Sequence, residues 1–105
     1  MLLKAVQGAG ALLSLESGST QARVVLSALS NPGIQLLDQQ GRKRIDMRYI
    51  PEDAPEISLY DTDGNRRLEL GTLSDGGRLT MKDRESRNAV SLYSRGGRGK
   101  LVLGE

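Results

Sequence analysis

The fold is decided by the stretch Ile57-Ser58-Leu59-Tyr60-Asp61-Thr62-Asp63-Gly64-Asn65-Arg66-Arg67-Leu68-Glu69-Leu70. It holds two apolar pairs, Ile57/Leu59 and Leu68/Leu70, on either side of a polar segment. The spacing of two within each pair is the period of a β-strand, so the pairs point to one face while Ser58 and Glu69 point to the other. The stretch therefore predicts a β-hairpin.

The polar segment has the chemistry of a tight turn. In Asp61-Thr62-Asp63-Gly64, the Asp at the first position accepts bonds from the backbone N–H groups of the turn, and the Gly adopts the positive φ of a bulge after a type I turn. Asp38-Gln39-Gln40-Gly41 repeats this pattern, and Asp83-Arg84-Glu85-Ser86 repeats it with Ser in place of Gly. We expect the same hairpin turn three times.

The whole hairpin pattern recurs along the chain. Copies begin at Ile34, Ile57 and Leu79, and a worn copy runs from Leu13 to Leu26. Return turns are expected at Ser30-Asn31-Pro32-Gly33, Pro51 to Pro55, Ser74-Asp75-Gly76-Gly77 and Arg95-Gly96-Gly97-Arg98-Gly99. The sequence thus predicts one all-β domain over 1–105, made of tandem antiparallel hairpins of about 22 residues. The repeats lie near 13–32, 33–55, 56–77 and 78–99, with half-repeats at 1–12 and 100–105.

The half-repeats carry complementary strands. Lys100-Leu101-Val102-Leu103 matches the first strand of a repeat, and Leu3 and Ala5 fall where Val24 and Leu26 would lie in a second strand. The halves could pair within one chain and close a ring, or pair between chains in a head-to-tail array. Helix-compatible spacing occurs only over residues 2–13.

Composition removes most catalytic chemistry. The 105 residues include no Cys and no His, which excludes imidazole bases, thiol nucleophiles, Cys/His zinc sites and disulfides. No Ser or Thr has a base to activate it, so we expect no enzyme, no catalytic residue, no metal and no cofactor. The net charge of +2 is no nucleic-acid footprint. Met1 to Leu15 is too short and too interrupted to span a membrane, so no membrane partner is expected, and the compartment stays open between cytoplasm and a virion or appendage.

The expected core is aliphatic, because the chain has no Trp or Phe. The residues predicted to share one inward face are Leu13, Leu15, Val24, Leu26, Ile34, Leu36, Ile45, Met47, Ile57, Leu59, Leu68, Leu70, Leu79, Met81, Val90, Leu92, Leu101 and Leu103, and those from Ile34 onward are the proposed assembly core. Something must cover this face. A barrel or solenoid, a sandwich, or identical sheets packed around an axis would each do so. Medium-sized side chains without large aromatics favour the last, a narrow β-prism built as a homo-oligomer, with a trimer preferred.

Two kinds of turn could bind ions. Asp61-x-Asp63-Gly64-Asn65 begins like a calcium loop, but Arg66 and Thr72 replace the Gly and Glu that such a loop needs, so a structural turn is the better interpretation. Basic clusters at Arg42, Lys43 and Arg44, and at Arg95, Arg98 and Lys100, are candidates for an anionic glycan or nucleic acid. No aromatic platforms accompany them, so solvated turns are the simpler reading.

The segment from Gly33 to Leu103 resembles a class of bacterial tandem-repeat proteins, through Leu59-Tyr60-Asp61 with Gly64, Arg67, Leu68 and Leu70. This resemblance implies an all-β repeat protein and no particular activity. Tyr60 to Asn65 is also similar to the YD repeats of Rhs-type proteins, whose hairpins wind into shells around toxin cargo. The architecture is analogous to phage and injection-machine spikes and fibres, which wind short β repeats about a trimer axis.

The sequence as a whole favours a structural, self-assembling protein, a homo-oligomeric shaft, spike or fibre segment without catalysis. Its partner would be the chain itself, as a trimer or in a head-to-tail array. A non-catalytic binding module for an anionic glycan or nucleic acid is the alternative.

Overall fold

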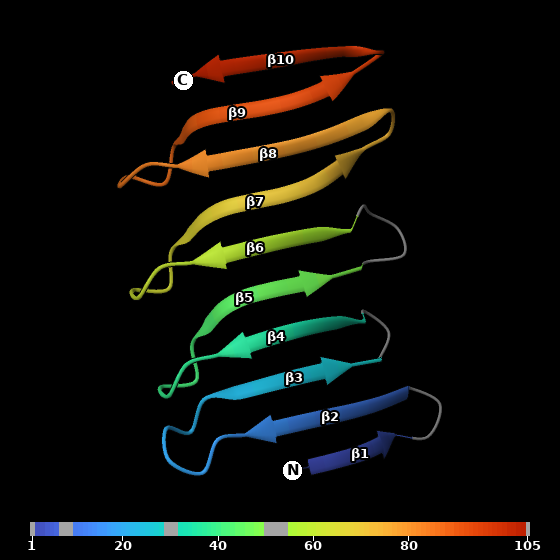
Figure 1. Ribbon diagram of the computed structural model, residues 1–105, viewed down its shortest axis with the longest axis vertical. Coiled ribbons are helices and arrows are strands. Elements are labelled where there is room, and N and C mark those ends of the chain that lie inside the picture. Colours follow the sequence, from blue (N-terminus) through green and yellow to red (C-terminus); the bar gives the residue numbers. More distant parts are fainter. Residues whose placement is uncertain (1, 7–9, 29–31, 50–54, 105) are drawn as a thin grey trace.

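The computed structural model describes residues 2–6, 10–28, 32–49 and 55–104. They form ten strands in one sheet, and each strand pairs antiparallel with its neighbours in the sequence (Figure 1). The strands are β1 (Leu2–Val6), β2 (Gly10–Glu16), β3 (Arg23–Ser27), β4 (Gly33–Leu37), β5 (Lys43–Arg48), β6 (Glu56–Tyr60), β7 (Arg66–Leu73), β8 (Gly76–Lys82), β9 (Asn88–Arg95) and β10 (Arg98–Leu103). The all-β prediction is confirmed. The helix that the spacing over residues 2–13 allowed is wrong, because β1 and β2 occupy the described part of that segment.

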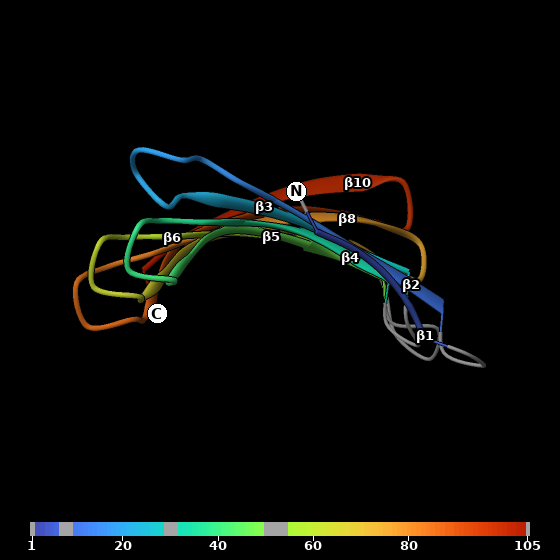
Figure 2. The same ribbon diagram turned by 90° about the horizontal axis from the view of Figure 1, so that it is seen from below.

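The sheet is a single curved layer (Figure 2). It measures 44 × 32 × 16 Å, and β1 and β10 lie at its opposite edges. Among the described residues, the sheet does not close into a ring and no second layer covers it.

The register brings the predicted apolar residues together on one face. Ile57 lies opposite Leu70, and Leu59 lies opposite Leu68. Repeating these pairings across the sheet gives two continuous rows, which we call the loop-side ladder and the turn-side ladder. The loop-side ladder is Leu13, Leu26, Ile34, Met47, Ile57, Leu70, Leu79, Leu92 and Leu101. The turn-side ladder is Leu15, Val24, Leu36, Ile45, Leu59, Leu68, Met81, Val90 and Leu103.

The three aspartate turns have the predicted geometry. Gly41 and Gly64 adopt φ values of 79° and 87°, and Ser86 adopts 65° at the equivalent position. The register shifts beside each turn, where Leu36 and Leu37, Leu59 and Tyr60, and Met81 and Lys82 face the second strand of their hairpin. Each shift is a bulge, so the second strand carries one extra residue. All three bulges lie at the same end of the strands (Figure 1).

The return turns lie at the opposite ends of the strands, and those that are described are tighter than the aspartate turns. Gly96 and Gly97 both have positive φ, 59° and 79°, as a two-residue hairpin turn with mirror-image geometry requires. Gly76, which follows Ser74-Asp75, lies so close to β9 that a Cβ there would sit 1.8 Å from the carbonyl oxygen of Ser94. Of the other predicted return turns, residues 30–31 and 51–54 lie outside the described residues.

The N-terminal strand pairs in a different register from the one the sequence indicated. Leu3 lies opposite Leu13, which in turn lies opposite Leu26. Leu3 therefore corresponds to Leu26, and not to Val24 as its distance along the chain suggested. The expected match is wrong by two residues because the return connections differ in length: Leu3 and its partner Leu13 are ten positions apart, whereas Leu26 and Ile34 are eight apart.

No apolar side chain of the described residues is buried within the single chain, because a single layer has nothing to pack its apolar side against. The buried side chains are polar: Asp46, Ser58, Glu69 and Thr80, each 7% exposed or less. These four residues form a row across the middle of the opposite face, since Asp46 pairs with Ser58, Ser58 with Glu69, and Glu69 with Thr80.

Candidate assembly surface

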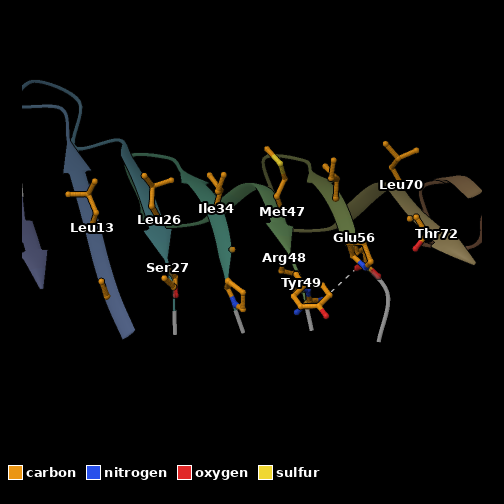
Figure 3. A pocket seen from close by; sticks show the side chains of 17 residues that line it. Leu13, Leu26, Ser27, Ile34, Met47, Arg48, Tyr49, Glu56, Leu70 and Thr72 are labelled. Carbon is orange, nitrogen blue, oxygen red and sulfur yellow. Dashed lines mark ion pairs between the residues drawn. The ribbon is translucent and has the colours of Figure 1, made fainter. Parts of the chain in front are cut away.

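The two ladders form an uncovered apolar face. Most of their large side chains are exposed, from 36% for Met47 to 72% for Leu103. Figure 3 shows Leu13, Leu26, Ile34, Met47 and Leu70 pointing to the same side of the sheet, from β2, β3, β4, β5 and β7. The register confirms the alternation that predicted a shared face; the role of these residues as an assembly core stays a prediction.

The total surface shows how unusual this exposure is. The chain has 7291 Å² of accessible surface. A compact folded monomer of 11.4 kDa would expose about 5,800 Å². The chain therefore exposes about 1,500 Å² more than a compact monomer of its mass, as a single layer with an uncovered face does.

The apolar face is deepest at the end of the strands away from the aspartate turns. A groove of about 750 Å³ lies there, lined by members of the loop-side ladder together with Pro32, Tyr49 and Pro55. Arg48 and Glu56 also contribute to the lining, and their side chains form an ion pair with 3.6 Å between Nη2 and Oε1 (Figure 3). Glu56 Oε1 also accepts a hydrogen bond from the Ser58 hydroxyl at 3.3 Å, so this pair belongs to the opposite face of the sheet. Apart from this pair the lining is largely apolar, so the groove suits a hydrocarbon surface better than a charged molecule.

Long charged side chains cover the opposite face, which we call the polar face. Glu69 is its centre: Lys82 Nζ lies 3.3 Å, Arg66 Nη1 3.5 Å and Arg78 Nη1 3.9 Å from the carboxylate oxygens of Glu69. These ion pairs hold three long basic side chains against Glu69, one residue of the buried polar row.

The same network continues towards β5. Lys43 Nζ lies 3.6 Å from Asp46 Oδ2 and 5.3 Å from the centre of the Tyr60 ring. The hydroxyl of Tyr60 accepts a hydrogen bond from Arg66 Nη2 at 3.3 Å. No buried polar atom of the described side chains lacks a partner, so this face is saturated without a ligand.

The aspartates fix their turns through both carboxylate oxygens. Asp61 Oδ1 accepts the N–H groups of Asp63 and Asn65, both at 2.9 Å, and Oδ2 accepts Arg67 Nε at 2.7 Å. The hydrogen bond from the Asn65 backbone, helped by the one from Arg67, lowers the pKa of Asp61 to about 2.

Asp83 and Asp38 repeat these contacts. The N–H groups of Glu85 and Arg87 donate to Asp83, and the bond from Arg87 lowers the Asp83 pKa. Partial burial raises the pKa of Asp38, but hydrogen bonds from the backbone of Arg42 and Gln40 outweigh it and lower the pKa overall.

In two hairpins an arginine side chain contacts the backbone of the next hairpin. This contact was not predicted from the sequence. Arg44 Nε donates to the carbonyl oxygen of Tyr60 at 3.2 Å, and Arg67 Nη1 donates to the carbonyl oxygen of Asp83. Both arginines follow a turn aspartate by six positions, and that recurrence is the signal that could have revealed them. In the last hairpin Ala89 takes this position.

The structure does not bring the two basic clusters together. Arg42, Lys43 and Arg44 follow the turn between β4 and β5, whereas Arg95, Arg98 and Lys100 flank the turn between β9 and β10 at the other edge (Figure 1). Every member of the first cluster has an acidic partner within 4 Å. In the second, Arg95 pairs with Asp75 at 3.7 Å, while Arg98 and Lys100 are exposed and make no ion pair with the described residues.

The calcium-like turn is engaged internally. Both carboxylate oxygens of Asp61 already accept hydrogen bonds from the chain, as the structural interpretation expects. Nowhere in the described ranges do three acidic side chains gather as a metal site would need.

Comparison with known proteins found no relative: no family model matches the chain, no curated protein matches it, and no solved structure matches it. No helix among the described residues is long and apolar enough to cross a membrane.

Proposed function

We propose that this chain is a structural, self-assembling protein whose copies pack their apolar faces together to form the segment of a shaft, spike or fibre. The observation that carries the proposal is the pair of continuous, exposed aliphatic ladders on one face of a sheet whose other face is already saturated by ion pairs. One face exposes apolar side chains and the other has its charges paired, so a protein partner is expected on the apolar face only.

The excess surface fits an obligate oligomer. Obligate interfaces bury about 1,000–2,500 Å² on each partner. This range includes the excess of about 1,500 Å². A dimer and a cyclic trimer could both bury this area, so the geometry of the strands decides between them.

The strand length fits a narrow triangular prism. A strand such as β4, which has five residues, is about 17 Å long. An equilateral triangle with sides of about 17 Å places each side about 5 Å from the axis, half of the ~10 Å spacing between packed sheets. Three sheets would thus bring their ladders into contact along the axis, and aliphatic side chains without large rings would fill that space.

The deciding measurement is the molar mass in solution, by light scattering on a sizing column at micromolar concentration. We expect a multiple of the 11.4 kDa chain mass, with three copies as the unit. Met47→Lys places a charge in the middle of the apolar face and is expected to shift the mass to that of one chain. Met47 is already 36% exposed in the single chain, so the substitution leaves the sheet intact.

Gln35→Lys is the matched control, because Gln35 lies opposite Asp46 in the row of the polar face. It adds the same charge and is expected to leave the oligomer unchanged, with circular dichroism verifying the strands of both variants. A wild-type chain that stays monomeric, or a control that dissociates as readily as Met47→Lys, would overturn the proposal.

A binding module for an anionic glycan or nucleic acid is the second candidate, favoured by Arg98 and Lys100, which are exposed and make no ion pair with the described residues. A binding module of this kind predicts retention on a heparin column that weakens steeply with salt. Arg98→Gln together with Lys100→Gln should abolish that retention, whereas Arg42→Gln, whose guanidinium already pairs with Asp38, should not. Absent or salt-insensitive retention would reject this candidate.

A further inference from the structure

The two edge strands of the sheet carry complementary halves of a hairpin. β10 has the register of a first strand, since Leu101 lies opposite Leu92 just as Leu79 does on the other side of β9. β1 has the register of a second strand, since Leu3 lies opposite Leu13 as Leu26 does. Inside the sheet, a first strand is always followed by a second strand.

We infer that the outer edge of β10 binds β1 of a second copy, antiparallel, with Leu101 opposite Leu3 of that copy. The register is dictated by the hairpins within the chain, where Ile34 lies opposite Met47 and Ile57 opposite Leu70. This contact joins copies end to end along the sheet. It uses a different surface from the apolar face and extends the proposed segment in length.

The hydrogen-bonding groups of both edges match this register. The N–H of Gly104 donates to the carbonyl of Ala89, so the inward groups of β10 belong to Gly104 and to every second residue before it. The groups of Gly99, Leu101 and Leu103 consequently point outward. The same alternation, continued through the sheet, turns the groups of Leu3 and Ala5 outward in β1.

The outer edge of β10 also exposes large apolar side chains. Leu101 and Leu103 are 58% and 72% exposed, the two highest values among the large apolar residues of the described chain. Val102 lies in the row that is polar from Gln35 to Ser91, and Leu2 holds the corresponding register position in β1. Exposed apolar edge strands are templates for pairing with another chain.

One feature of the junction makes it sensitive to salt. The inferred register places Lys100 opposite Lys4 of the next copy, and like charges directly opposite each other weaken a strand pair. Screening by salt removes this repulsion. End-to-end growth is therefore expected to increase with salt concentration.

Gly99→Pro tests the edge without altering the apolar face. A Cβ at Gly99 meets no atom within 4 Å, and the N–H that proline removes points outward, so the single sheet accepts the change. We expect wild-type chains at high salt to form rods in electron micrographs and a broad distribution of large masses in sedimentation velocity. Gly99→Pro should reduce these to one lateral unit, whereas Gly99→Ala, which keeps the N–H, should form rods like the wild type.

Cysteine pairs test the register, because the chain has no cysteine of its own. Residues opposite each other in a bonded pair have Cα atoms about 5.5 Å apart, within disulfide range. The double variant Leu3→Cys with Leu101→Cys should give a series of multimers on a non-reducing gel after mild oxidation. An equal mixture of the two single variants should give only dimers joining one variant to the other.

Three outcomes would overturn the inference. Rods formed by Gly99→Pro as readily as by the wild type would remove β10 from the contact, as would wild-type units that never join at any salt concentration. Disulfide dimers of Leu101→Cys alone would show β10 pairing with β10. Failure of the proposed function gives a separate result: under conditions in which no rods form, the measured mass would be that of a single chain.

Discussion

Arg67 lies between two hairpins and holds both: its Nε donates to Oδ2 of Asp61 at 2.7 Å, and its Nη1 reaches the carbonyl oxygen of Asp83 in the next hairpin. The contact makes the turn of one hairpin part of the contact with its neighbour. Local turn chemistry and long-range stacking therefore depend on the same side chain, and perturbing the aspartate should weaken both.

The Asp61 carboxylate should make the sheet sensitive to acid. Its pKa is about 2 in the folded chain, against about 3.9 in an unfolded one. Because the folded pKa is the lower, the stabilisation is fully present above about pH 4 and is lost as the pH falls towards 2. Asp38 and Asp83 shift in the same direction.

We expect the melting temperature of the wild type to fall between about pH 4 and pH 2. Asp61→Asn keeps an acceptor for the turn N–H groups but has no charge to titrate, so its melting temperature should fall less steeply. Asp63→Asn, in the same turn, should follow the wild type, since the Asp63 carboxylate accepts no hydrogen bond from the described residues. Parallel curves for wild type and Asp61→Asn would contradict this prediction.

Gly76→Ala should be strongly destabilising. The added Cβ would lie 1.8 Å from the Ser94 carbonyl oxygen, which belongs to the backbone of β9, so β8 and β9 must separate locally. We expect the free energy of unfolding to drop by about 2 kcal/mol or more in urea titrations. Gly18→Ala, where a Cβ meets nothing within 4 Å, is the control and should change little. Equal stability of the two variants would disprove the close approach.

Removing the charge of Glu69 should weaken the polar face. Glu69→Gln keeps the size of the side chain but leaves Arg66, Arg78 and Lys82 facing one another without their shared anion. We expect a loss of about 1–2 kcal/mol, smaller at high salt. Glu85→Gln, on a side chain that is 60% exposed and pairs with Arg87, should cost less than about 0.5 kcal/mol. A Glu69→Gln variant as stable as the wild type would mean that the network covers the row without stabilising it.

Lateral association through the apolar face should weaken on cooling. Burial of aliphatic surface is driven by water entropy near room temperature, so it loses strength towards 4 °C. Sedimentation of the Gly99→Pro variant at about 4 and 30 °C should show more dissociation in the cold. Stronger association in the cold would indicate that polar contacts, and not the ladders, hold the copies together.

Strand pairing in the repeats was predictable because two local signals agree there. The spacing of Ile57 and Leu59 set the face, and Asp61 with Gly64 set the turn and its bulge, so the register of that hairpin followed. The same signals worked for Asp83 with Ser86, even though Ser pays a steric penalty at positive φ. They failed at Leu3, because its register depends on a return connection, and these connections vary in length: Leu3 and Leu13 are ten positions apart, whereas Leu26 and Ile34 are eight apart.

The burial of the polar row was not predicted, because the alternation in the sequence indicates the opposite. Asp46, Ser58, Glu69 and Thr80 each lie between two apolar residues, where the pattern indicates exposure to water. What buries them is the fold of long side chains such as Lys43 and Arg66 across neighbouring strands, which depends on pairs far apart in the chain. A period of two assigns residues to a face, but it does not say which face will be covered.

The bulges beside the three aspartate turns each put one extra residue into the second strand of a hairpin, at the same end of the strands. Each bulge bends its strand and adds to the right-handed rotation from strand to strand. Anything built by stacking such sheets end on end will wind like a screw, so its images should display a helical pitch set by how often an extra residue occurs.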